Sequence, residues 1–347
     1  MRNILCVTLI ALLGGCTSTS VTEKYQDKRN DIINVKDKVI EFETGNVLIG
    51  SVSRLYMSNK CLLIADHKSV DKQIHIFNKN DFSYLTSIGN FGEGPEEITV
   101  MGCLAIDEAH HQLYVSDHAK QKIFSYDMDS VMVDSLYKPQ VKTAMNETLF
   151  PSEYQYINDT LSIAVLIKPT STSTFNQFLG RWNMNTGEMI PMKYTHPDIQ
   201  KKRITFAASE KAGIYVECYT RHDLMTICSL DGELLYNIYG PDWDGGNGNK
   251  LQSFGTVMIG NDKIFVSYCG EDYARDSFPT KILVFDLEGN YLKTLETGYK
   301  ISDCCYDSFN NRIILSLNDV VQFAYLDIDG IISVSYTHLT LPTKLEV

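Results

Sequence analysis

The sequence of 347 residues predicts an all-β fold: a six-bladed β-propeller with four antiparallel strands per blade and a ring closed by an N-terminal strand. The main observation behind this prediction is a short apolar strand that recurs six times, most clearly as Leu113–Asp117 (Leu-Tyr-Val-Ser-Asp). Its copies start at residues 62, 113, 161, 214, 264 and 313, so neighbouring copies lie 48 to 53 residues apart. A repeat of this length is typical of the four-stranded blades of a propeller.

Three further strands complete each repeat. In the second repeat, an apolar strand at residues 102–106 precedes the recurring strand, and Lys122–Asp127 follows it. Turns rich in Asp, Gly and Asn, such as residues 231–233 and 287–290, lead to a last strand, because these residue types accept the backbone conformations of tight hairpins. No stretch of helical period is long enough to connect parallel strands, which argues against an α/β fold.

The ring also needs a closing contact. Residues 38–43 alternate between apolar and charged side chains and precede the first full repeat. We expect them to pair with the last blade, because closure removes exposed strand edges that would otherwise template aggregation. The propeller is therefore predicted to extend over residues 38–333.

Composition narrows the classes of partner. The chain contains 20 Tyr and 15 Phe, residues that favour half-buried sheet surfaces. Its net charge of −12 repels phosphate backbones, so nucleic acid is not an expected partner. We expect a monomer.

The first sixteen residues have the form of an export signal. Arg2 supplies a positive start, residues 4–13 are apolar, and the run is far shorter than the ~20 residues of a membrane-spanning helix. The segment Leu13–Cys16 (Leu-Gly-Gly-Cys) resembles the bacterial lipobox. In such signals the peptide is cut before the cysteine, here removing residues 1–15, and acyl chains are attached to the cysteine.

We therefore predict lipidation at Cys16 and anchoring in the cell envelope. The outer membrane is favoured over the inner one because Thr17, and not Asp, follows the cysteine. An ordinary signal peptide with a chance cysteine is the alternative. Residues 16–37 are polar and without periodicity, which predicts a flexible tether. Residues 334–347 resemble a translated sequencing adapter and are expected to be non-native, with a genuine edge strand as the alternative.

A family resemblance supports this architecture. Six repeats, the lipobox and the segment Ile88–Glu97 together resemble the TolB-like six-bladed propeller lipoproteins of Bacteroidales. Members of that family often carry Gly-x-Gly-Pro-Gly-Glu after an early blade, and here Glu96 stands where Gly is usual. The resemblance implies the fold and an envelope location, and it implies no settled reaction.

Candidate metal ligands are weak. The run from Asp242 to Asn249 has the oxygen donors and glycines of a calcium loop, with Asp242, Asp244 and Asn247 as candidate ligands, but Ser253 stands where a bidentate acid should close it. A loop without calcium is the alternative, and no cofactor is predicted. The adjacent histidines His110 and His111 are expected to point apart from a turn.

Other motifs favour structural roles. Gly92–Pro95 lacks the lysine and the helix start of a phosphate loop and is expected to be a turn between blades. Asp66 and Asp117 share one repeat position, which favours a hydrogen bond in a turn over catalysis. The seven cysteines beyond the signal match no zinc spacing and are expected to be small apolar fillers on strands: Cys61, Cys103, Cys218, Cys228, Cys269, Cys304 and Cys305.

Two classes of function fit these observations. One is a non-enzymatic binding or scaffold propeller that takes a protein, peptide or glycan ligand on a loop face. The alternative is a calcium-dependent hydrolase or lyase with its site at the axial mouth, which would need acidic or histidine side chains converging from several blades. Because the chain shows no Gly-x-Ser-x-Gly motif or other catalytic signal, the sequence favours binding over catalysis, with no catalytic residue to name.

Overall fold

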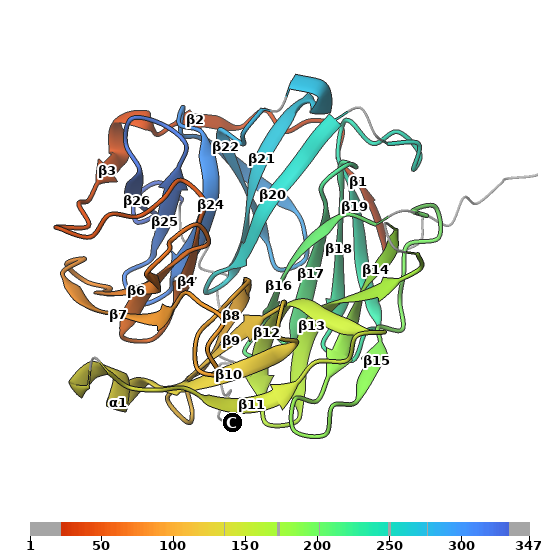
Figure 1. The fold of residues 1–347 in the computed structure, drawn as a ribbon. Helices are drawn as coiled ribbons and strands as arrows, with labels where there is room; N and C mark the ends of the chain where they lie inside the picture. Colours follow the sequence, from red (N-terminus) through yellow and green to blue (C-terminus); the bar gives the residue numbers. More distant parts are fainter. Residues whose placement is uncertain are drawn as a thin grey trace, which may run out of the picture.

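The computed structural model describes residues 22–134, 136–171, 174–200, 202–248, 251–275 and 277–332, and it is a six-bladed β-propeller (Figure 1). The predicted lipidation residue Cys16, the signal peptide and the tail at residues 334–347 lie outside the described residues. Within the described ranges, no helix has the length and apolarity needed to cross a membrane.

Each blade is an antiparallel sheet of four strands in chain order, and blade 6 takes its fourth strand from the N-terminal segment. Blade 1 consists of β4 (Ser53–Met57), β5 (Cys61–Asp66), β6 (Lys72–Asn78) and β7 (Tyr84–Asn90). Blade 2 consists of β8 (Met101–Asp107), β9 (Gln112–Asp117), β10 (Lys122–Asp127) and β11 (Gln140–Ala144). Blade 3 consists of β12 (Phe150–Asn158), β13 (Leu161–Pro169), β14 (Phe175–Trp182) and β15 (Met189–Pro191).

The second half of the ring follows the same order. Blade 4 consists of β16 (Ile204–Ser209), β17 (Ile214–Tyr219), β18 (Leu224–Ser229) and β19 (Leu234–Tyr239). Blade 5 consists of β20 (Leu251–Ile259), β21 (Lys263–Asp272), β22 (Lys281–Asp286) and β23 (Tyr291–Glu296). Blade 6 consists of β24 (Ile301–Asp307), β25 (Arg312–Leu317), β26 (Phe323–Asp327) and β3 (Val39–Glu41).

The recurring strand of the sequence is the second strand of every blade. β5, β9, β13, β17, β21 and β25 begin at, or one residue from, the predicted starts, and most of their residues are buried on both sides. Both sides are buried because neighbouring blades pack face to face, as Leu63 and Ile76 of blade 1 do in one apolar cluster with Leu104 and Val115 of blade 2. Full burial of each such side chain contributes roughly 1.5–3 kcal/mol, so the repeat is stable only as a stack of blades.

Ring closure occurs as predicted. β3 pairs antiparallel with β26, so that Ile40 lies opposite Tyr325, and the amide of Phe42 donates to the carbonyl of Phe323. Without β3, blade 6 would have three strands and an open edge at β26. The predicted closing segment at residues 38–43 therefore contains the strand that completes the ring.

The flexible tether predicted at residues 16–37 is wrong for its described part. Glu23–Tyr25 forms β1, which adds a parallel fifth strand to the outer edge of blade 4 beside β19. Ile32–Asn34 forms β2, a parallel fifth strand on blade 5 beside β23, and the 3₁₀ turn η1 (Lys36–Lys38) leads on to β3. We call residues 22–34 the strap. Figure 1 shows the strap following the rim from blade 4 to blade 5 before β3 reaches blade 6.

One buried ion pair fastens the middle of the strap. The Arg29 guanidinium lies 2.7 Å from the Asp223 carboxylate, and the two side chains are 7% and 0% exposed. Arg29 also lies over the rings of Phe254, Tyr268 and Phe285, at 5.6 to 5.7 Å from their centroids. Burial raises the pKa of the Asp223 carboxyl, and the neighbouring charge of Arg29 acts against this rise.

The only α-helix among the described residues is α1 (Met128–Val133), a short insertion between β10 and β11. Asp127 caps its start by accepting from the amide of Ser130 at 2.7 Å. The hairpin turns use glycine where it was expected: Gly232 and Gly289 have φ values of 85° and 80°, which other residues rarely adopt.

Candidate functional site

A channel with a volume of about 1450 Å³ runs along the propeller axis. The first strand of every blade lines it, namely β4, β8, β12, β16, β20 and β24, which surround the centre of the ring in Figure 1. Its wall combines aromatic side chains such as Tyr56, Tyr156 and Phe206 with hydroxyl, amide and charged groups. Such a mixed wall suits a polar ligand with apolar parts.

An ion pair crosses this channel. Arg54 of blade 1 lies 2.8 Å from Glu153 of blade 3, and the side chains are 47% and 39% exposed. The two residues belong to blades that are not neighbours, so the pair joins parts of the wall on either side of blade 2. An exposed ion pair contributes ~1 kcal/mol or less to stability. Breaking this pair would therefore cost little if either side chain turned to a charged group of a ligand.

Asp303 also lines the channel, and it has a structural role. Its carboxylate accepts from the amide of Leu55 in blade 1 at 2.8 Å and from the Thr256 hydroxyl in blade 5 at 2.7 Å. Burial raises the pKa of this carboxyl. The hydrogen bonds tie blade 6 to both of its neighbours, because each comes from a different adjoining blade.

Two histidines line the channel from equivalent positions of blades 1 and 2. His67 follows Asp66 at the end of β5, and His118 follows Asp117 at the end of β9. His67 Nδ1 donates to the Met101 carbonyl at 3.2 Å, which places the proton on that nitrogen. Burial lowers the pKa of both imidazoles, and within the described residues their Nε2 atoms have no hydrogen-bond partner.

Sequence reasoning missed the channel residues. Arg54, Glu153 and Asp303 lie on the first strand of their blades, where the repeat is least regular, so no shared position marks them. The histidines did carry a signal, since the dipeptide Asp-His recurs at 66–67 and 117–118. That signal gives a repeat position, and only the fold shows that this position lines the channel.

The shared aspartates behave as predicted. The Asp66 carboxylate accepts from the amide of Gly50 at 2.7 Å and from that of Lys68 at 2.9 Å. Asp117 likewise accepts from the amides of Thr99 and Ala119 at 2.8 and 3.0 Å. Both carboxylates therefore fasten the loop that enters their blade to the turn that leaves the second strand.

The glycine-rich segment is the predicted turn between blades. It connects β7 to β8 and encloses the Lys120 ammonium, which donates to the carbonyls of Gly94 at 2.6 Å and Glu97 at 2.5 Å. A side chain at Gly92 would collide with the Glu97 carboxylate. The loop presents carbonyls to a cation, so it is unsuited to phosphate.

The three candidate calcium ligands have separate partners. The Asp242 carboxylate accepts from the Tyr268 hydroxyl at 3.3 Å, whereas Asp244 lies 3.8 Å from the His222 imidazole. The Asn247 side-chain amide donates to the backbone carbonyl of Asp244 at 3.1 Å. The structure therefore turns the two carboxylates toward different neighbours.

The adjacent histidines point apart as expected. His110 Nδ1 lies 2.9 Å from the Asp107 carboxylate, and His111 Nδ1 lies 2.7 Å from Asp129 at the start of α1. The seven described cysteines are all buried with free thiols, which agrees with their prediction as apolar fillers.

The fold and its channel define a six-bladed β-propeller with a ligand-sized axial cavity. Residues 18–176 match a family described as 6-bladed beta-propeller (DUF5128), which covers a little less than half of the chain. No curated protein matches the sequence.

Solved structures with the same fold come from several sources. A protein of Bacteroides fragilis described as exported has 14% identity and a TM-score of 0.56, with 85% of this chain and 87% of that chain covered. A DUF4221 family member from Bacteroides vulgatus has 11% identity and a TM-score of 0.55, covering 86% and 98%. A luciferin-regenerating enzyme has 8% identity and a TM-score of 0.55, covering 84% and 95%. At these identities the likeness concerns the fold.

Proposed function

We propose that this protein is a cell-envelope lipoprotein, anchored through Cys16, whose channel binds a protein segment, a peptide or a glycan without chemical conversion. The observation that carries the proposal is the axial cavity of about 1450 Å³ with aromatic walls and the Arg54–Glu153 pair across it. A cavity of this size exceeds the needs of a small metabolite and fits an extended polar chain.

Binding is favoured over a metal-dependent enzyme because the potential metal ligands lie away from the channel. Among the described residues, one group of three potential ligands lies within 4.8 Å, formed by Asp107, His110 and Asp159. None of these three side chains lines the channel. Of the charged residues that do line it, Arg54 and Glu153 form an ion pair, and Asp303 accepts hydrogen bonds from two neighbouring blades.

The ligand is tested by saturation-transfer NMR with a tripeptide library and a panel of neutral oligosaccharides. We expect one of the two sets to bind, and the double variant Arg54→Gln/Glu153→Gln to weaken that binding about tenfold or more, since ligand contacts to both charges are lost. A matched control removes the exposed Arg181–Asp231 pair on the rim, 2.9 Å apart, through Arg181→Gln/Asp231→Asn. Binding that survives the channel variant, or no binding of either set, would refute a channel site.

The anchor has its own test. Thr22 lies six residues after Cys16, and its carbonyl accepts from the amide of Asn237 within β19. Six residues span at most ~20 Å, so a lipid on Cys16 would hold the propeller close to the bilayer. Cells grown with an alkynyl fatty acid should label the wild-type protein and leave Cys16→Ser unlabelled and released from the membrane fraction. Equal labelling of both proteins would disprove lipidation at Cys16.

A further inference from the structure

Two junctions between neighbouring blades contain turns of the same conformation, but the charged residues around these turns differ. The turn after β8 reads Asp107-Glu-Ala-His110-His111-Gln112, and the turn after β24 reads Asp307-Ser-Phe-Asn310-Asn311-Arg312. The fifth residue of each turn has a positive φ, 53° at His111 and 48° at Asn311. In both turns the first carboxylate accepts from the backbone amide of the fourth residue. The turns are therefore structurally equivalent.

At the junction of blades 6 and 1, protein cations neutralise the turn carboxylate. Asp307 is fully buried, with Arg312 at 3.2 Å and Lys79 of blade 1 at 3.5 Å. The Asn310 side-chain amide donates to the same carboxylate at 2.7 Å. The two-residue turn between β4 and β5 of blade 1 is Asn59-Lys60, and its first residue is uncharged.

At the junction of blades 2 and 3, the equivalent positions lack those cations. Gln112 stands at the place of Arg312, and Met184 stands at the place of Lys79. Asp107 is nonetheless only 1% exposed, and the facing turn adds a second carboxylate, Asp159, where blade 1 has Asn59. In the described part of the chain, no lysine or arginine forms an ion pair with either aspartate.

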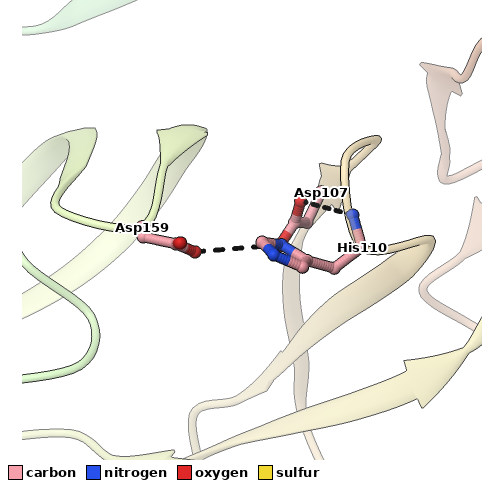
Figure 2. A group of neighbouring side chains, drawn as sticks. All are labelled: Asp107, His110 and Asp159. Atoms are coloured by element: carbon pink, nitrogen blue, oxygen red, sulfur yellow. Dashed lines mark hydrogen bonds and ion pairs between the residues drawn. The ribbon is translucent and has the colours of Figure 1, made fainter.

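An imidazole takes the place between these carboxylates. His110 Nδ1 lies 2.9 Å from Asp107 Oδ2 and 3.8 Å from Asp159 Oδ1, and the ligand atoms of all three residues lie within 4.8 Å of one another. Figure 2 shows His110 between the two carboxylates, with Asp159 reaching it from the neighbouring blade.

Two tyrosines hold the carboxylates in this arrangement. The Tyr114 hydroxyl donates to Asp107 Oδ2 at 3.1 Å, and the Tyr156 hydroxyl donates to Asp159 Oδ1 at 2.7 Å. Partners of this kind orient the ligands of a metal and leave their remaining lone pairs free to bind it.

We propose that Asp107, His110 and Asp159 bind a zinc ion that joins blades 2 and 3, in the place that Arg312 and Lys79 fill between blades 6 and 1. One imidazole and two carboxylates suit zinc, whereas calcium takes oxygen ligands. Tetrahedral ligands at ~2.0–2.1 Å from zinc lie ~3.3 Å apart. Rotation of the half-exposed His110 and Asp159 side chains closes the remaining distance, and binding displaces the proton from His110 Nδ1.

The primary test compares metal-stripped wild-type protein with Asp159→Asn, titrated with ZnCl₂ against a chromophoric chelator. We expect the wild type to bind one more zinc ion per chain than the variant, and His110→Asn to behave as Asp159→Asn does. His111→Asn is the matched control, because it makes the same substitution one residue away and should bind as the wild type. Equal zinc stoichiometry in the wild type and Asp159→Asn would overturn the proposal.

A second variant transplants the cations of the other junction. Gln112→Arg/Met184→Lys should not bind the extra zinc ion. Zinc should raise the melting temperature of the wild type and leave that of this variant unchanged. An undiminished rise in this variant, if folded, would also count against the site. Should the variant fail to fold, the comparison with the exposed Asp159→Asn decides alone.

Discussion

The N-terminal segment joins the propeller in two different ways. β3 supplies a strand that blade 6 lacks, whereas β1 and β2 add fifth strands to blades that already have four. The first contact is antiparallel and completes the ring; the others are parallel pairings of three residues each at the rim. Ring closure and the attachment of the strap are therefore separable: β3 supports the global fold, and the strap should have a local stability of its own.

Truncation should produce the largest contrast. A protein that begins at residue 35 keeps β3 and should unfold cooperatively near the melting temperature of the full mature chain. A protein that begins at residue 43 lacks β3, leaves β26 unpaired and should aggregate or melt more than ten degrees lower. Circular dichroism melts of the two proteins measure the difference. Similar melting of both would show that β3 does not close the ring.

Removing the charge of Arg29 should release the strap. Arg29→Met leaves the Asp223 carboxylate buried without its cation, which costs about 3 kcal/mol of local stability. Adding Asp223→Asn should restore much of that loss, because the uncompensated charge disappears. Limited proteolysis within residues 22–34 measures the opening. Equal cleavage of the single variant and the wild type would contradict the fastening role of Arg29.

Acidification should loosen the same region through His196. Its Nε2 donates to the Tyr239 hydroxyl at 3.0 Å, Tyr239 donates to Glu23 of β1, and the Asp198 amide donates to His196 Nδ1 at 3.3 Å. Burial lowers the pKa of His196, so the folded state binds fewer protons than the unfolded state. The stability from this neutral imidazole is present above the ordinary histidine pKa of ~6.5 and is lost as the pH falls below it.

Melting temperatures at pH 7 and pH 5 measure this effect. The drop on acidification should be smaller in His196→Gln, whereas exposed His111→Gln should retain the full drop. If the melting temperature fell equally in His196→Gln and in the wild type, His196 would not be the cause of the loss of stability at low pH.

The smallest expected effect concerns Tyr25. Its ring stacks on Tyr239 with centroids 4.5 Å apart but is 70% exposed. Tyr25→Ala should therefore weaken the strap by only ~1 kcal/mol. Hydrogen exchange of the Gln26 amide, which donates to the Tyr239 carbonyl, reports this change. A loss as large as that of Arg29→Met would reverse the ranking of contacts.

β3 and the strap also show which parts of the fold could be predicted from the sequence. The second strand of each blade is buried on both faces, so its apolar pattern is strong and recurs; β3 alternates and precedes the first repeat. The strap strands have three residues each, with Ile32 and Tyr25 exposed, and their pairing depends on a sheet edge more than 200 residues away. A polar segment of this kind is indistinguishable by composition from a tether.

The candidate sites also fall into those that the sequence predicted and those that it could not. The repeat marked Asp66 and Asp117 because turn geometry recurs, and the structure confirms those hydrogen bonds. Arg54 and Glu153 meet across the channel from positions that no repeat relates, and Asp159 reaches His110 from another blade. Convergence of this kind follows from the closed ring and is absent from any local pattern.

Amide hydrogen exchange over residues 22–42 of the mature protein tests the two modes of attachment most directly. The amide of Phe42, which donates to the carbonyl of Phe323, should exchange only with global unfolding, while the amides of Gln26 and Val35, which donate to blades 4 and 5, should be protected to a lesser but clear degree. Exchange of residues 22–34 at the rate of an unstructured peptide would contradict the strap, and equally fast exchange in β3 would contradict closure of the ring.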